Sequence, residues 1–243
     1  MTAFDELVAH PGTGRLFEHT VLPGIGDAAP GGRVRLDALA RWLQDVAHAD
    51  TVDAGLGGAA LWVVRRARLR VERFPRFGEP ATLRTFCSGL GRMWAERRTT
   101  IATPGGVAVE AVGLWVHLDA GGGRPVPPAP AELAAWAPST GGRVVKARLR
   151  HPDPPAGAPE APWTFRAAEL DLADHVNNAA YWTPLEEELL AGPEPAALDA
   201  EIEYRTPAQA GPLRLARDGP RRWLVAADGT VHASVVLGLD GIN

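Results

Sequence analysis

The chain has 243 residues, of which 46% are hydrophobic and 22% charged, so it carries enough apolar side chains for a sizeable core. Its formal net charge of -4 argues against nucleic-acid binding through bulk positive charge, and its one cysteine, Cys87, excludes a disulfide within the chain. The N-terminus lacks the basic flank and apolar run of a signal peptide, and no apolar stretch approaches the roughly 20 residues of a membrane-spanning helix. We therefore expect a soluble, cytoplasmic protein.

The first strong pattern along the chain predicts a helix over residues 36–49, where apolar side chains recur at helical spacing. Residues 77–86 indicate a turn that leads into a strand. Residues 92–102 and 105–119 flank a glycine turn and alternate in polarity, which predicts a β-hairpin.

Two connectors interrupt this pattern. Residues 121–130 are rich in Gly and Pro and precede a short helix predicted at 131–136. Residues 152–162 contain too many prolines for a helix or a central strand. We place the domain boundary near residue 140, so that residues 1–140 form one domain and residues 141–243 a second.

The second half repeats the order of the first. A helix is predicted from Asn177 to about Leu190, followed by a turn and strand at 209–216 and a hairpin at 221–226 and 228–240. Each half is thus a helix followed by antiparallel strands. The simplest fold with this order is α+β, with two tandem hotdog domains in which an antiparallel sheet wraps around a central helix.

The residues that carry chemistry lie at the start of this second helix. Asp171 and His175 follow a strand-like stretch and make a candidate acid/base pair. Asn177 and Asn178 lie at the predicted helix start, where unpaired amides can polarise a substrate carbonyl and stabilise an oxyanion. Asp and Asn are also common helix caps, so the residues alone leave a purely structural role open.

Residues 171–181 resemble the D-x-N-x-H-V-N-N-x-x-Y motif of the acyl-ACP thioesterases, and residues 36–55, 61–86, 110–119 and 201–208 resemble further motifs of that family. The resemblance implies hydrolysis of a fatty acyl thioester of acyl carrier protein, or of CoA, in fatty acid biosynthesis. It implies Asp171 as base or nucleophile and His175 as an orienting and assisting group. No cofactor or metal is implied.

Two departures from the family pattern leave other functions open. The family's catalytic Asn falls at Ala173, and its acidic residue falls at Pro207. A non-catalytic acyl-binding hotdog protein, a hotdog acyl-CoA thioesterase and a hotdog dehydratase are therefore alternatives. A further hypothesis is that one of three neighbouring glutamates faces the site and supplies the missing carboxylate: Glu186, Glu187 or Glu188.

The first half is predicted to lack a site of its own, because aligning Trp42 with Trp182 sets Gly31 and Arg35 against Asp171 and His175. The resemblance implies that this half supplies the acyl cavity instead. The candidate lining residues are Leu39, Leu43, Val46, Trp62, Val64 and Trp115.

A basic run is the last candidate feature. Arg66, Arg68 and Arg70 share one face of a predicted strand and are candidates for docking an acidic acyl carrier protein. A solvated strand face is the alternative interpretation. A second copy of the chain, in a homodimer, is a further candidate partner.

Overall fold

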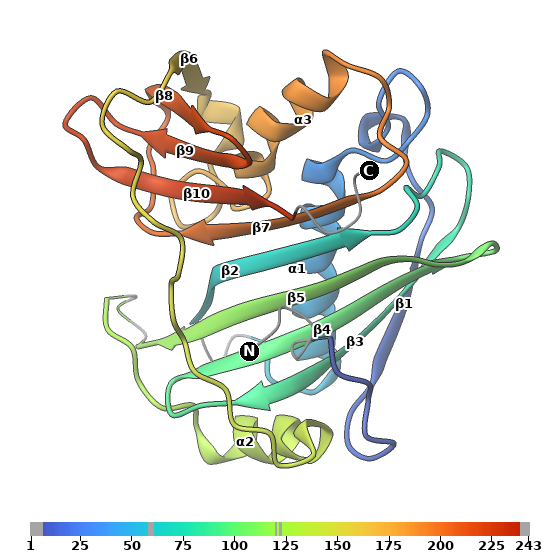
Figure 1. The fold of residues 1–243 in the computed structure, drawn as a ribbon. Coiled ribbons are helices and arrows are strands. Elements are labelled where there is room, and N and C mark those ends of the chain that lie inside the picture. The colour runs from blue at the N-terminus through green and yellow to red at the C-terminus, as the bar shows by residue number, and fades with distance from the viewer. Residues whose placement is uncertain (1–6, 58–60, 120, 122, 239–243) are drawn as a thin grey trace.

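The computed structural model describes residues 7–57, 61–119, 121 and 123–238. Within these residues, ten strands form one antiparallel sheet in the order β1-β3-β4-β5-β2-β7-β10-β9-β8-β6 (Figure 1). The strands are β1 (Phe17–Val21), β2 (Leu61–Val71), β3 (Ala81–Leu90), β4 (Trp94–Thr103), β5 (Gly106–Leu118), β6 (Glu160–Phe165), β7 (Leu198–Tyr204), β8 (Gly211–Asp218), β9 (Arg221–Val225) and β10 (Val231–Leu237). The helices are α1 (Leu36–Asp53), α2 (Pro130–Trp136) and α3 (Thr183–Leu190), with short 3-10 turns η1 (Ile25–Asp27), η2 (Ala137–Thr140), η3 (Ala167–Glu169) and η4 (Ala180–Trp182).

Helix α1 packs against one face of the sheet, here called the inner face, and crosses behind the central strands in Figure 1. Its buried side chains include Leu36, Leu39 and Val46, whose spacing places them on the side turned to the core. The helix predicted at 36–49 is confirmed and continues to Asp53.

The second helix is shorter than predicted. Residues 178 and 179 form a turn, η4 follows, and α3 begins only at Thr183. Pro184 has no N–H to donate to the carbonyl of Ala180, so it fits the first turn of an α-helix and not the interior. Both predicted hairpins are present, although residues 239 and 240, which close the second one, lie outside the described residues.

The two halves of the sheet have the same strand order. From the outer edge to the centre, the first half runs β1-β3-β4-β5-β2 and the second runs β6-β8-β9-β10-β7. At the centre β2 pairs antiparallel with β7, and Ala67 lies opposite Ile202. Each half begins with a strand before its helix: the first, β1, was not predicted, whereas the second overlaps the strand-like stretch expected before Asp171. The second of these, β6, contains Pro162 and lies at the edge of the sheet, where a missing backbone donor is tolerated.

The turn before each helix is also built twice from the same backbone hydrogen bonds. The N–H of Ala29 donates to the carbonyl of Arg33, and the N–H of Asp171 donates to the carbonyl of His175, each at 2.8 Å. The two turns continue alike: Arg35 N–H donates to Asp27, as Asn177 N–H donates to Glu169. The counterparts of Asp171 and His175 are therefore Ala29 and Arg33, and the predicted pairing with Gly31 and Arg35 is wrong by two residues.

The connector between the halves crosses the outer face of the sheet, opposite α1 (yellow in Figure 1). The fully buried carboxylate of Glu203 accepts hydrogen bonds from the backbone N–H groups of Arg150 and His151. The indole of Trp223 donates to the carbonyl of Pro152 at 2.9 Å. These contacts attach the connector to the second half of the sheet.

Among the described helices, none combines the length and the apolar character that crossing a bilayer requires.

Candidate active site

The loop that carries Asp171 and His175 is a tight turn. One carboxylate oxygen of Asp171 accepts the N–H of Ala173 at 2.9 Å, and Asp174 has a φ of 57°, which closes the turn in the left-handed region. The side chain of Gln209 donates to the carbonyl of Asp174 at 2.8 Å and braces the loop from outside. One carboxylate oxygen of Asp171 therefore caps a backbone N–H of its own turn, which is the structural role that the sequence left open.

The catalytic candidates keep unused capacity for hydrogen bonds. Asp171 and His175 are both half-buried, and within the described residues no hydrogen bond joins their side chains. In the same set of residues neither ring nitrogen of His175 has a partner, and the second carboxylate oxygen of Asp171 has none. Both groups therefore remain available to a substrate or to water.

Asn177 and Asn178, in the turn before η4, have different roles. The side-chain oxygen of Asn177 accepts the N–H of Ala179 at 2.9 Å and the side-chain amide of Gln44, from α1, at 3.0 Å. The carbonyl of Asn178 accepts the hydroxyl of Tyr204 at 3.1 Å. The backbone N–H of Asn178 has no acceptor among the described residues, so it is the donor left for a ligand oxygen.

A narrow pocket with a cavity volume of about 30 Å³, part of it open to solvent, lies beside Asn178 and extends between α1 and the inner face of the sheet. It is predominantly apolar, as pockets that take organic ligands are. It reaches Asn178 and Ala179 but is not lined by Asp171 or His175, which lie on the loop leading into it. Its lining comprises Ala40, Leu43, Gln44, Val64, Ala67, Arg97, Thr99, Ala111, Gly113, Trp115, Asn178, Ala179, Trp182 and Tyr204.

Small side chains on the sheet create this space in the first half. In the register of the sheet, Gly113 lies opposite Ala67, whereas Val235 lies opposite Ile202 at the corresponding place in the second half. Residues opposite one another in antiparallel strands point to the same face, so both pairs face inward. A Cβ at Gly113 would lie 2.8 Å from Nε1 of Trp115, which shows that the indole occupies the room left by the glycine.

A charged group, Arg97, forms part of the pocket wall. Arg97 contacts the carboxylate of Asp50 at 2.6 Å, and this fully buried carboxylate also binds Arg15 at 2.5 Å. The guanidinium of Arg97 lies 5.3 Å from the ring of Trp136, within the range of a cation–π contact. Ion pairs between α1, β4 and the segment before β1 therefore hold this part of the pocket wall in place.

The predicted lining residues divide into two groups. Leu43, Val64 and Trp115 line the pocket. Leu39 and Val46 do not line it but pack in the buried core, and Trp62 lies away from it, donating its indole N–H to Glu132 at 3.2 Å. These three residues do not line this pocket, and their place in an acyl cavity stays a prediction.

Sequence reasoning missed Gln44, Arg97 and Gly113. A signal for Gln44 existed, because it is a polar residue four positions after Ala40 and three before Ala47, on the apolar face of α1. Arg97 and Gly113 come together only through the pairing of β4 with β5, so local sequence offers no signal for them.

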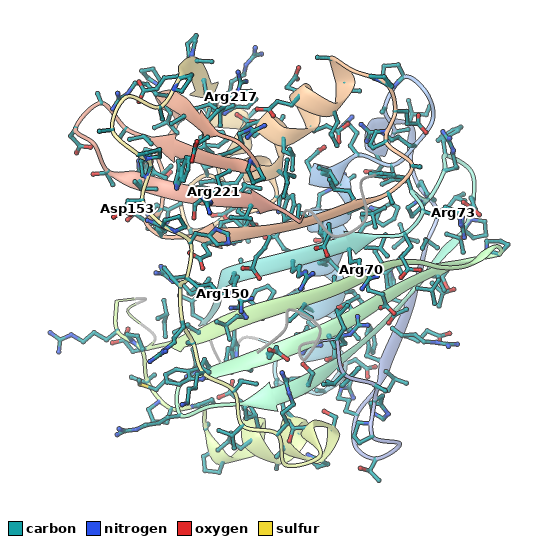
Figure 2. The ribbon with its side chains drawn as sticks, viewed as in Figure 1. Arg70, Arg73, Arg150, Asp153, Arg217 and Arg221 are labelled. Atoms are coloured by element: carbon teal, nitrogen blue, oxygen red, sulfur yellow. The ribbon has the colours of Figure 1, made fainter. Side chains whose placement is uncertain are left out.

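The basic run on β2 lies on the outer face in a ladder of opposite charges. Arg68 binds Asp199 of β7 at 2.8 Å, and Arg66 lies 3.7 Å from Glu201. Arg70 lies on the same face, and Figure 2 shows it to the right of the connector that carries Arg150. Arg66 is buried, which removes it from any surface that a carrier could touch, while docking by Arg68 and Arg70 stays a prediction.

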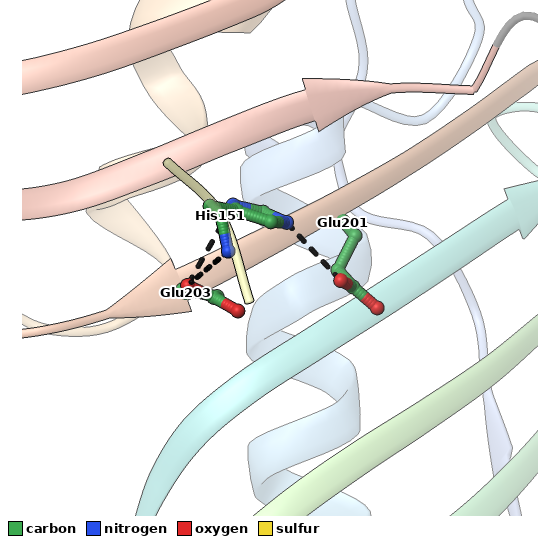
Figure 3. Close-up of side chains that lie close together, drawn as sticks. All are labelled: His151, Glu201 and Glu203. Atoms are coloured by element: carbon green, nitrogen blue, oxygen red, sulfur yellow. Dashed lines mark hydrogen bonds and ion pairs between the residues drawn. The ribbon is translucent and has the colours of Figure 1, made fainter. Parts of the chain in front are cut away.

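A histidine and two glutamates gather on this outer face (Figure 3). His151, Glu201 and Glu203 bring their ligand atoms within 4.8 Å of one another, a donor set that suits a metal ion. The atoms already have partners, since His151 binds Glu201 at 3.1 Å and Glu203 holds the connector. Burial raises the pKa of Glu201, but hydrogen bonds from His151 and Arg150 outweigh it and lower this pKa to about 2. The contacts of this cluster attach the connector to the sheet, so we assign the cluster a structural role.

None of the three neighbouring glutamates replaces the missing carboxylate. Glu186 is buried in an ion pair with Arg33 at 2.7 Å, and Glu188 binds Arg217 and Arg222, each at 2.9 Å. Glu187 is exposed, and no member of the group lines the pocket.

The fold is shared with known thioesterase structures. The acyl-ACP thioesterase from Bacteroides thetaiotaomicron VPI-5482 superposes with a TM-score of 0.75 at 16% identity, over 91% of this chain and 96% of that one. The 12:0-ACP thioesterase from Umbellularia californica superposes with a TM-score of 0.72, also at 16% identity and over 91% and 96%.

Sequence comparison points the same way. Residues 16–133 match the family model of the acyl-ACP thioesterase N-terminal domain, which confirms the resemblance that the motifs indicated. An uncharacterized protein of Mycobacterium tuberculosis (strain ATCC 25618 / H37Rv) is 26% identical over 207 residues, which cover 84% of this chain and 83% of that protein.

Proposed function

We propose that this protein is an acyl thioesterase, which hydrolyses a fatty acyl thioester to the free fatty acid and a thiol. The observation that carries the proposal is the apolar pocket that opens at Asn178, beside a turn bearing two groups able to move protons. The resemblance to the acyl-ACP thioesterases supports an acyl carrier protein as the carrier and fatty acid biosynthesis as the setting, with CoA as the alternative carrier.

The reaction is addition of water to the thioester carbonyl followed by loss of the thiol. The N–H of Asn178 would bind the carbonyl oxygen and stabilise the oxyanion formed on attack. Asp171, through its second oxygen, would take the proton of the attacking water. When the C–S bond breaks, the sulfur would receive a proton, and His175 is the group placed to orient the thioester and supply it. Direct attack by Asp171 is the alternative route, through an anhydride that water then cleaves.

We further propose that the two halves are tandem hotdog domains, residues 1–140 and 141–243. The repeated strand order and the repeated turn before each helix support this division. In this arrangement the first half holds the acyl chain, because Ala67 and Gly113 line the pocket and the pair formed by Ile202 and Val235 does not.

A non-catalytic acyl-binding protein is the second candidate. It is favoured by Ala173 and Pro207, which offer no functional side chain where the resembled family has its Asn and its acidic residue. The pocket would serve either function.

The test is thiol release from a series of acyl-ACP and acyl-CoA substrates of increasing chain length, with wild type, Asp171→Asn and His175→Ala compared. We expect turnover by wild type and losses of about 10²-fold or more in both variants, with unchanged circular dichroism. No turnover of any substrate by wild type, together with acyl binding, would establish the second candidate.

A further inference from the structure

We propose that Gln44, on the helix of the first half, is a positioning residue that keeps the oxyanion donor of the second half open. This inference rests on the proposed function. It comes from the duplication of the turn before each helix. In one copy a side chain of the protein accepts the hydrogen bond of the turn's backbone N–H, and in the other copy that N–H has no acceptor among the described residues.

The duplication assigns the counterparts. If Arg33 corresponds to His175, then Leu36 corresponds to Asn178, and Gln44 in α1 corresponds to Glu186 in α3. Each helix therefore presents this position to the turn of the other half. Gln44 contacts the turn of the second half through Asn177, and Glu186 contacts the turn of the first.

In the first half the donor is occupied. The N–H of Leu36 donates to a carboxylate oxygen of Glu186 at 3.0 Å, and Arg33 binds the same carboxylate. All three residues are buried. A carboxylate is the strongest acceptor for a helix N-terminus, so this turn holds an internal anion where a substrate oxygen would bind.

In the second half the donor is open. Gln44 directs its amide nitrogen to the side-chain oxygen of Asn177 at 3.0 Å, and the N–H of Asn178 has no acceptor among the described residues. Gln44 and Asn178 both line the pocket. A neutral amide bound in this way holds the turn without filling its donor, whereas a glutamate at position 44 would cap Asn178 as Glu186 caps Leu36.

The decisive substitution is therefore Gln44→Glu, which changes the side chain to a carboxylate of the same size. We expect kcat to fall by about 10² to 10³, the loss found when an oxyanion-hole donor is removed, while the melting temperature stays close to wild type. Gln44→Met, which removes the hydrogen bond to Asn177 but adds no acceptor, should lose less than about tenfold. His48→Glu, on the exposed side of α1, controls for the added charge.

Amide NMR of Asn178 provides a readout independent of activity. In Gln44→Glu the Asn178 N–H should shift downfield and exchange more slowly with solvent, as expected for a new bond to a carboxylate. Wild-type kcat in Gln44→Glu, equal losses in Gln44→Glu and Gln44→Met, or an unchanged Asn178 amide would each overturn the proposal. If wild type has no thioesterase activity, the proposed function fails, and the amide signal alone decides whether Gln44 keeps the donor open.

Discussion

The ion pair between Arg33 and Glu186 allows a quantitative prediction about stability. Both residues are 1% exposed, their charged atoms lie 2.7 Å apart, and Glu186 also caps the first amide of α1. Glu186→Ala leaves a buried guanidinium without a partner, which costs about 3–5 kcal/mol, and removes a cap that contributes about 1 kcal/mol. For a chain of this size each kcal/mol lowers the melting temperature by about 2–4 °C, so we expect a decrease of roughly 8–24 °C.

Thermal and urea unfolding followed by circular dichroism would measure this loss. The control is the double variant Arg33→Met with Glu186→Leu, which removes both charges and keeps similar volume. We expect it to recover most of the stability, because replacing a buried pair by apolar side chains is often neutral. A decrease of under 3 °C in Glu186→Ala, or a double variant as unstable as the single one, would refute the reasoning.

Three further outcomes follow from the structure. Gly113→Val should lower kcat/KM for the longest acyl chains about tenfold or more and leave kcat/KM for short chains unchanged. The reason is that the valine side chain enters the pocket and meets Trp115. Equal kcat/KM values in the variant and wild type across the chain-length series would contradict this prediction. The pKa of Glu201 is lowered from 4.5 to about 2, so its contribution to stability, up to about 3 kcal/mol, is complete above pH 4.5 and disappears as the pH falls towards 2. Urea unfolding at pH 6 and pH 3 should therefore show a smaller acid-induced loss in Glu201→Gln than in wild type, and equal losses would count against it. Burial raises the pKa of Cys87 to about 11, so a thiol reagent at pH 7.5 should label it only after denaturation, and rapid labelling of the folded protein would disagree with its buried position.

Local sequence patterns predicted much of the architecture. The helical spacing of Leu36, Leu39 and Val46 predicted α1, and the glycine turns predicted both hairpins, because these features depend on neighbours a few residues apart. The motif around Asp171 and His175 identified the candidate loop and the resembled family. Pro184 shows the limit of such patterns, since apolar spacing continued across 177–182 although the regular helix begins only at Thr183.

Only the tertiary structure decided which side chains form the pocket and which donor is open. Gly113, Ala67 and Arg97 come together through strand register, and Gln44 reaches Asn177 from the other half of the chain. Leu39 and Leu43 occupy neighbouring turns of one apolar helix face, yet only Leu43 lines the cavity. Local sequence specifies which face of a helix or strand turns toward the core. The space left between a helix and the sheet depends on the side chains of both elements, and these side chains are distant from one another in the sequence.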